Sequence, residues 1–306
     1  MAAAGSEAGA WLRQMAQAVQ SLNYVGTFVY QHPSGLEAMR IVHASENGVE
    51  HEKLSSLTGP VREVIRDNRM VTCVLGDRRA VMVSQSRPRQ PFPAGFARDI
   101  RGLSDYYEFR MGARDRVAGI VCQEVEVAPR DAYRYGHRLC IDAERRMLLR
   151  ARLTEPDGTL IEEVMFTDIR YPEDIDEALL QPSLDESGLR WVREPRHADS
   201  PAPADWRSRW VVQQLPPGFA MTDHSHHQFV SHGPNVEHWV YSDGLASVSV
   251  YIEKMRDQAG GDAEGVSRRG ALNAFGTRVA GHYVTVVGEV PRATVELIGR
   301  SVRYRP

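Results

Sequence analysis

Apolar and polar residues alternate in short stretches along the chain, and Asn23–Tyr30 is the stretch around which the pattern is organised. It is rich in β-branched and aromatic residues, which favour a pleated strand. Because successive side chains of a strand point to opposite faces, Tyr24, Phe28 and Tyr30 are predicted to share one face. Both faces are largely apolar. The pattern therefore predicts a strand that is covered on both sides or that lines a wide cleft.

Similar stretches, separated by turn residues, continue to about residue 180 and predict an antiparallel meander curved around an apolar interior. The first group of predicted strands comprises Leu36–Ala44, Val49–Leu54, Val61–Arg66, Arg69–Leu75 and Arg79–Ser84. The second group comprises Tyr106–Met111, Val117–Val127, Tyr133–Ile141, Arg146–Leu153 and Leu160–Asp168, with Gly112 as the first of its turns. Between the groups, the prolines of Arg87–Pro93 remove donors from any ladder, so an exposed loop or lid is expected, followed by a short helix over Ala94–Leu103.

A helical period of three to four residues replaces the alternation near both ends of the chain. Ser6–Leu22 repeats Leu12, Met15 and Val19 on one stripe, which predicts a helix laid on the sheet that follows. Pro291–Val302 repeats apolar residues in the same way and begins with proline, which suits the first turn of a helix.

The middle of the chain changes character after the meander. Ser183–Arg209 is rich in proline and charge and has no sustained period, so we interpret it as a linker or an extended interdomain segment. Beyond it, Val236–Ser242 and Leu245–Ile252 predict a hairpin across Asp243–Gly244, a strong turn pair. Val279–Val287 predicts a further strand.

A length of 306 residues agrees with two domains, because single cores rarely grow much past roughly 250 residues. We predict an α+β protein whose large N-terminal domain, residues 1–185, is an antiparallel half-barrel with helices. Residues 186–208 are predicted to be the linker, and residues 209–306 a smaller α+β domain.

Composition and charge narrow the classes of function. A net charge of −3 gives no electrostatic reason to expect nucleic acid as a partner. No apolar run approaches the roughly 20 residues that a membrane helix needs. Met1–Ser6 has neither a basic start nor an apolar centre, so no signal peptide is expected there. A cytoplasmic protein and a mature exported chain with an added start methionine both remain open.

The three cysteines are Cys73, Cys122 and Cys140. Cys122 and Cys140 lie equally far from Asp131, the middle of a predicted hairpin turn, which would place them opposite each other on neighbouring strands. They would form a disulfide in an oxidising compartment. Three buried free thiols are the alternative.

The sequence contains no Gly-x-Ser-x-Gly elbow, no Gly-x-x-x-x-Gly-Lys-Ser/Thr loop and no His-Glu-x-x-His motif, and no cofactor is predicted. Ser242 and Asp243 with His238 could be drawn as a nucleophile set, but the Asp–Gly turn explains the first two residues fully. The histidines between His224 and His238 could bind zinc or copper, although a polar loop between strands is the simpler interpretation. Pro129–Gly136 is dense in arginine and tyrosine. These residues could hold the carboxylates of a partner, or arginine–aspartate pairing could brace a hairpin, and the second interpretation is favoured.

Five blocks of sequence together resemble the RseB/MucB family. In chain order they are Asn23–Tyr30, Pro129–Gly136, Val240–Val250, Gly270–Gly276 and Gly281–Pro291. The resemblance implies a periplasmic regulator of the sigma-E (AlgU) envelope-stress response and not an enzyme. It implies binding to the periplasmic part of a membrane-spanning anti-sigma factor, which is thereby protected from the first regulatory protease. It also implies a half-barrel similar to lipoprotein carriers of the LolA and LppX type.

The half-barrel cleft of such a protein is expected to sense lipid, either lipopolysaccharide or another acyl-chain ligand, and the smaller domain to supply much of the partner contact. The predicted cleft residues are Tyr24, Phe28, Tyr30, Met39 and Ile41. The predicted partner-binding residues are Arg130, Tyr133, Arg134, Tyr135, Trp191, His238, Tyr241 and Tyr251. A switch would need only that lipid and anti-sigma peptide favour different arrangements of two loosely joined domains.

Two other functions stay open at this point. One is a lipid or lipoprotein carrier without a regulatory role. The other is a metal-dependent hydrolase that uses the histidines between His224 and His238. A homo-oligomer is also compatible with the sequence.

Overall fold

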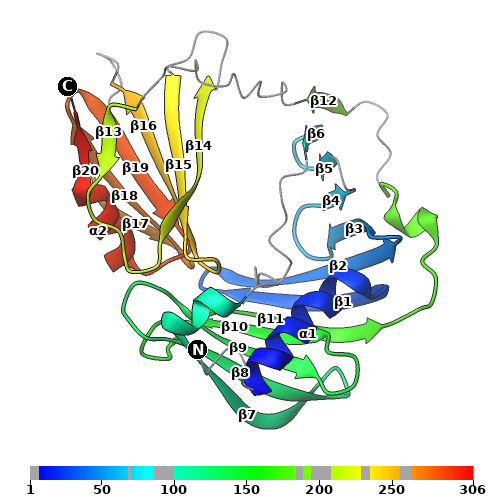
Figure 1. Ribbon diagram of the computed structural model, residues 1–306. Helices are drawn as coiled ribbons and strands as arrows, with labels where there is room; N and C mark the ends of the chain where they lie inside the picture. The colour runs from blue at the N-terminus through cyan, green and yellow to red at the C-terminus, as the bar shows by residue number, and fades with distance from the viewer. Residues whose placement is uncertain are drawn as a thin grey trace.

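The computed structural model describes residues 7–67, 70–85, 100–183, 189–193, 208–228, 235–255 and 264–305. Its largest element is a 12-stranded sheet that curves around a helix (Figure 1). In spatial order the strands are β12 (Arg190–Arg193), β6 (Ala80–Gln85), β5 (Met70–Leu75), β4 (Arg62–Arg66), β3 (Val49–Ser56), β2 (Gly35–Glu46), β1 (Tyr24–His32), β11 (Leu160–Arg170), β10 (Leu148–Thr154), β9 (Gly136–Asp142), β8 (Ile120–Pro129) and β7 (Tyr107–Val117).

Strand β1 lies inside this sheet, with the first meander on one side and the second on the other. All neighbouring strands pair antiparallel except β12, which pairs parallel with β6. This strand comes from the segment predicted to be the linker, so part of that segment extends the large sheet. The predicted meander is confirmed.

Helix α1 (Glu7–Ser21) covers the middle of the curved sheet (Figure 1). Its stripe of Leu12, Met15 and Val19 is at most 2% exposed and shares one core with Tyr24 and Phe28 of β1. Full burial of a side chain of this size contributes about 1.5–3 kcal/mol, so the stripe alone explains why the helix docks on the sheet.

The cross-strand register defines the face of β1 that turns toward the helix. Phe28 pairs with Met39, and Gly26 pairs with Ile41. A Cβ atom at Gly26 would lie 2.7 Å from Cε1 of Phe166 and 2.8 Å from the carbonyl oxygen of Asp168. Glycine has a low strand propensity, but Gly26 is required here because β11 approaches too closely for a side chain at this position.

The same face continues as an apolar strip past the end of α1. Ile41 pairs with Leu54, Leu54 with Val64, Val64 with Cys73, and Cys73 with Met82. Leu54, Val64 and Cys73 are half-buried, and Met82 is exposed. On the opposite face, the Lys53–Glu63 ion pair of 3.1 Å is buried under the chain that follows the 3₁₀ helix η2 (Glu177–Leu180).

The C-terminal part of the chain forms a second, 6-stranded sheet. Its order is β14 (Ala220–Gln228), β15 (Asn235–Ser242), β16 (Ser247–Lys254), β19 (His282–Gly288), β18 (Leu272–Val279) and β17 (Gly265–Arg269). Helix α2 (Arg292–Ser301) and the pair β13 (Trp210–Val212) and β20 (Val302–Tyr304) pack on one face. The fold class is thus confirmed as α+β, with a large antiparallel sheet and a smaller sheet domain.

Three details of the sequence prediction are corrected. Strand β7 does not end at Gly112 but continues to Val117, and the turn to β8 is made by Ala118 and Gly119, both with positive φ. Gly112 instead lies where the β7–β8 register shifts, with its Cβ position only 3.0 Å from Cβ of Glu124.

The predicted strand Val279–Val287 is likewise two strands joined by a turn at Ala280–Gly281. The predicted helix after the proline-rich loop corresponds only to the short 3₁₀ helix η1 (Arg101–Asp105). The rest of that helix, and the predicted loop Arg87–Pro93, lie outside the described residues.

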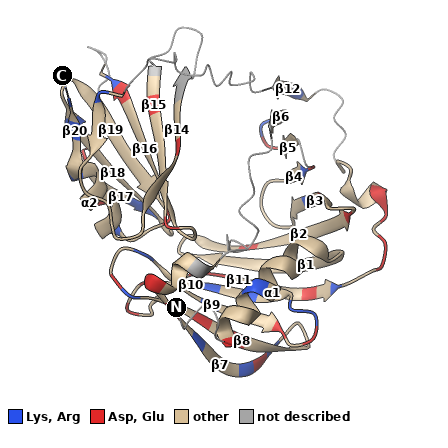
Figure 2. Ribbon diagram, in the orientation of Figure 1, with Lys and Arg blue, Asp and Glu red and all other residues tan. Residues whose placement is uncertain are grey.

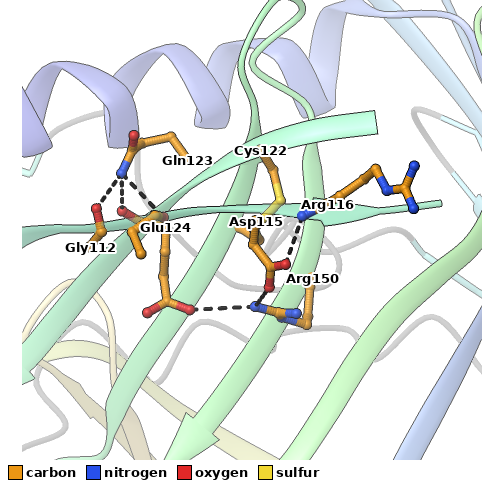
Figure 3. Close-up of a disulfide and its surroundings, with 9 residues drawn as sticks. Gly112, Asp115, Arg116, Cys122, Gln123, Glu124 and Arg150 are labelled. Atoms are coloured by element: carbon orange, nitrogen blue, oxygen red, sulfur yellow. Dashed lines mark hydrogen bonds and ion pairs between the residues drawn. A yellow bond between two sulfur atoms is a disulfide. The ribbon is translucent and has the colours of Figure 1, made fainter. Parts of the chain in front are cut away.

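Cys122 and Cys140 form a disulfide between β8 and β9 (Figure 3). The cysteines do not pair directly, because Cys122 lies opposite Asp142 and Cys140 lies opposite Glu124. The bridge therefore crosses the two strands diagonally, with a Cα–Cα distance of 5.4 Å. The predicted disulfide is confirmed, and Cys73 is not part of it.

Charges of both signs are interspersed over the two sheets (Figure 2). Beside the disulfide, Arg150 contacts Asp115 at 2.9 Å and Glu124 at 3.4 Å (Figure 3). Within the described ranges, no helix is both long enough and apolar enough to span a bilayer.

Candidate functional site

The two domains contact each other directly, through hydrogen bonds and through apolar contacts such as those of Ala271 with Tyr135 and Ile161. The hydroxyl of Tyr135 donates to the carbonyl of Ala271 at 3.1 Å and accepts from the Asn273 amide at 2.9 Å. The Thr294 hydroxyl donates to the carbonyl of Tyr133 at 2.6 Å. The expectation of two loosely joined domains is therefore wrong for this arrangement of the protein.

A buried arginine is the centre of this interface. Arg134 is 0% exposed, and its guanidinium lies 3.4 Å from Asp131 of its own loop and 3.5 Å from Asp243 of the other domain. It also donates to the carbonyl of Pro217 at 2.6 Å. The rings of Tyr106, Tyr107 and Phe219 surround it at 4.8–5.4 Å. We call Arg134 and Asp243 the interdomain latch.

Asp243 has two separate functions. Its Oδ1 accepts from the backbone N–H groups of Leu245 and Ala246, which closes the hairpin turn. Its Oδ2 accepts from the hydroxyl of Tyr107 at 3.1 Å and faces Arg134. The Asp–Gly turn pair in the sequence accounts for the first function, and the interdomain contact is additional.

A cavity of about 510 Å³ lies between the two sheets, beside the latch. This volume is in the range of small-molecule binding sites. The large domain lines it with Phe28, Tyr30, Glu37, Met39, Tyr107, Tyr135, His137, Ala151, Arg152, Leu153, Glu162 and Val164. The small domain closes it with Leu245, Ala246, Ser247 and Glu289.

The predicted cleft residues fall into two groups. Phe28, Tyr30 and Met39 line the cavity. Tyr24 and Ile41 share their face of the sheet but are buried in the core beneath α1, where Tyr24 stacks on His43 at 4.8 Å between ring centroids. Helix α1 therefore fills one part of the concave face of the large sheet. The other part stays open as the cavity that the small domain borders.

Glu162 joins the cavity wall to the domain interface. Its Oε2 accepts from the hydroxyl of Tyr30 at 2.7 Å, and its Oε1 accepts from the backbone N–H of Ala271 at 2.9 Å. Burial, followed by the neighbouring Glu162, raises the pKa of Tyr30 well above its usual value, so the phenol stays a donor. Sequence reasoning missed Glu162, because nothing local marks a strand residue whose partner lies in another domain.

Glu289 and His137 also line the cavity, and the pKa of each is shifted. Glu289 faces the cavity from the small domain, and the surrounding protein, followed by the charge of Glu162, raises the pKa of its carboxyl. Burial lowers the pKa of His137 to about 4, so this imidazole is neutral at neutral pH.

The predicted partner-binding residues lie in different places. Arg134 and Tyr135 are buried in the domain interface, where Tyr133 also takes part through its carbonyl, so this arrangement offers neither buried side chain to a partner. Tyr241 is buried in the core of the small domain. Arg130 is exposed, and Trp191 is half exposed on β12.

His238 and Tyr251 lie together on the sheet face that α2 does not cover. Their neighbours Trp239, Val250 and Ile252 belong to the core beneath α2, so alternation places His238 and Tyr251 on the other face. Their rings stack at 4.3 Å between centroids with an interplanar angle of 2°.

The histidine cluster was predicted to be a polar loop, and this is wrong: His224 and the residues up to Gln228 belong to strand β14. His224 lies 2.9 Å from the carboxylate of Glu237. Within the described part of the chain, no group of three or more His, Cys, Asp or Glu residues could hold a metal ion. His232, which the cluster would include, lies outside the described residues.

Comparison with known families matches both parts of this chain. The family model of the MucB/RseB N-terminal domain matches residues 7–184, and that of the MucB/RseB C-terminal domain matches residues 204–303. The chain belongs to the MucB/RseB family. The predicted family is thus confirmed, and with it the prediction of a regulatory protein that is not an enzyme, because curated members are sigma-factor regulatory proteins.

Relatives of this MucB/RseB chain match over nearly their whole length. The sigma factor AlgU regulatory protein MucB of Pseudomonas aeruginosa is 32% identical, with 97% of this chain and 91% of that protein covered. The sigma-E factor regulatory protein RseB of Escherichia coli is 26% identical, with 99% of this chain and 92% of that protein covered.

Solved structures of MucB share the fold. MucB in complex with MucA(peri) gives a TM-score of 0.75 at 28% identity, covering 98% of this chain and 100% of that one. The Pseudomonas aeruginosa MucA/MucB complex gives 0.76 at the same identity and coverage. A structure described as MucB without a named partner gives 0.66 at 27% identity, covering 98% of this chain and 99% of that one.

Proposed function

We propose that this protein is a periplasmic regulator that binds the periplasmic domain of a transmembrane anti-sigma factor of the MucA or RseA type. Binding protects that factor from regulated proteolysis and so restrains the sigma-E response. The observation that carries the proposal is the likeness to MucB in complex with MucA(peri), at a TM-score of 0.75 over 98% of the chain. The Cys122–Cys140 disulfide supports an oxidising compartment such as the periplasm.

The relation of the two domains supports a switch between arrangements. Identity and coverage are nearly equal for the three MucB structures, yet both MucA-bound structures score higher than the one described without a partner. Such a difference is what a two-domain protein with more than one domain arrangement would give.

The cavity supports an acyl ligand as the signal. It lies between the domains, and Phe28, Met39 and Val164 give it an apolar wall. Each buried methylene contributes about 0.8 kcal/mol, so an acyl chain can bind there without any catalytic group. A ligand bound between two domains shifts their arrangement only by its difference in affinity for the two states.

The partner surface we propose is the face of the small domain that α2 does not cover, at the half-buried Tyr251; His238 beneath its ring is only 6% exposed. Tyr251 to alanine should weaken capture of the anti-sigma periplasmic domain at least about tenfold, because interface hot spots are often aromatic. Tyr304 to alanine is the matched control, because Tyr304 packs against Trp210 away from that face. Equal binding by both variants would assign the partner surface elsewhere.

The decisive experiment is protection of the anti-sigma periplasmic domain from its first regulatory protease. The full-length protein should slow cleavage, and an acyl amphiphile should restore it. Absence of binding by folded protein would reject the proposal. Binding of the amphiphile without any effect on cleavage would favour a lipid or lipoprotein carrier, the second candidate that the cavity supports.

A further inference from the structure

The charges that line the cavity have an uneven distribution. Glu37, Glu162 and Glu289 contribute carboxylates, whereas Arg152 is the one cationic side chain among the described residues of the wall. The guanidinium of Arg152 already contacts the carboxylate of Glu163. An anionic head group inside the cavity would therefore meet three carboxylates and only one guanidinium, which is already paired with Glu163.

We propose that the cavity binds an amphiphile whose head group is an amine, with the ammonium between Glu162 and Glu289 and the alkyl chain along Phe28 and Met39. This inference rests on the proposed function of the cavity as an acyl-ligand site and adds the chemistry of the head group.

Glu289 has the environment of a carboxylate that lacks its counter-charge. It projects from the end of β19, and no donor among the described residues binds it. Glu162 lies close enough for its charge to act on Glu289. An ammonium between these two carboxylates would remove their repulsion, and its N–H groups would make charge-assisted hydrogen bonds.

Glu162 retains capacity to accept further hydrogen bonds. Each of its oxygens accepts one donor, from Tyr30 and from the Ala271 backbone, and a carboxylate has about four acceptor sites in total. Because these two bonds fix the side chain, a ligand would find the carboxylate already oriented. This pre-organisation lowers the entropy cost of binding.

The aromatic wall favours the same ligand chemistry. Phe28, Tyr30, Tyr107 and Tyr135 all line the cavity. Aromatic faces attract alkylammonium groups by about 0.5–2 kcal/mol, and aromatic side chains combined with carboxylates are a common way to bind them. A phosphate or carboxylate head group gains nothing from such faces.

The test compares three probes of equal chain length by calorimetry: dodecylamine, dodecanoate and dodecyl phosphate, each below its critical micelle concentration. The full-length protein should bind dodecylamine at least about tenfold more tightly than either anion. Glu289→Gln should reduce this preference to about threefold or less and leave dodecanoate binding unchanged or stronger. Glu264→Gln is the control, because this exposed carboxylate pairs with Arg278 away from the cavity wall.

The outcomes separate the two proposals. Equal affinity for amine and anions would overturn the head-group inference and leave the acyl-ligand function standing. A preference for dodecylamine that Glu289→Gln does not change would overturn the assigned position of the ammonium. Failure of all three probes to bind would overturn the acyl-ligand function itself, whereas anti-sigma protection would be tested independently.

Discussion

Replacement of Arg134 by methionine should loosen the two domains by removing the cation of the interdomain latch. The side chain of Asp243 is 0% exposed, so the substitution would leave a buried carboxylate without its arginine. Loss of one partner of a buried ion pair costs about 3–5 kcal/mol. Methionine keeps the apolar contacts of the arginine stem with the surrounding rings, so the effect reports mainly on the charge.

The structure places the expected loss at the lower end of that range. Asp243 would retain the hydroxyl of Tyr107 at 3.1 Å and the backbone donors of its own turn at 2.7–2.9 Å. We therefore expect a loss of about 3 kcal/mol for Arg134→Met. Combining it with Asp243→Asn should recover about half of this loss, because the asparagine oxygen can still accept the turn hydrogen bonds without a buried charge.

Urea unfolding and small-angle X-ray scattering would measure the two consequences separately. Unfolding gives the change in free energy for each transition, and the radius of gyration reports separation of folded domains. Arg134→Met should increase the radius of gyration in native buffer. Arg110→Met is the control, because Arg110 contacts Glu108 on the surface with half of its side chain exposed.

Two results would refute this reasoning. If Arg134→Met changed neither the radius of gyration nor the unfolding transitions, the latch would not hold the domains together. If the effects of Arg134→Met and Asp243→Asn were simply additive, the two side chains would not be coupled.

Three further predictions concern other parts of the molecule. Replacing Cys122 and Cys140 by alanine should lower the free energy of unfolding of the large domain by about 3 kcal/mol, measured by urea unfolding without reductant. The disulfide joins residues 18 positions apart, and closing a loop of about 15 residues stabilises a protein by about this amount. Gly26→Ala should cost about 1–3 kcal/mol in the same assay, since the new methyl group would meet Phe166, and full stability would contradict the packing described here. Glu289→Gln should raise the thermal midpoint relative to the wild-type protein at pH 7. Burial raises the folded-state pKa of Glu289, so the wild-type protein is most stable when this carboxyl is protonated and loses that stability as the pH rises through the raised pKa. The advantage of the glutamine variant should therefore disappear as the pH falls below the ordinary glutamate range.

Local patterns were sufficient to predict most of the elements. The β-branched and aromatic residues of Tyr24–Tyr30 and the helical stripe through Leu12 and Met15 are local signals, and the strand and the helix that they predict are both confirmed. The errors arose where a turn was assigned from one residue. Gly112 looks like a turn in sequence, but in the structure it lies at a shift of strand register.

The sequence predicted only the part of the candidate site that strands β1 and β2 form. Phe28, Tyr30 and Met39 line the cavity, and their role toward a lipid stays a prediction. Glu162 and Glu289 could not be found in this way, because their contacts join segments more than 100 residues apart, as in the bond from Ala271 to Glu162. Arg134 was singled out for its dense surroundings, but a local interpretation as a hairpin brace missed Asp243, its partner in the other domain.

The nature of the interface explains how a modest ligand could control it. The contacts through Tyr135, Thr294 and Glu162 are hydrogen bonds, each worth only about 0.5–1.5 kcal/mol net, because water replaces them when the domains part. Moving a two-state equilibrium from 1:99 to 99:1 requires about 5.5 kcal/mol of differential binding. At about 0.8 kcal/mol per methylene, that amount corresponds to about seven methylenes buried in one arrangement and not in the other. A single acyl chain is therefore long enough to shift the proposed equilibrium between two domain arrangements.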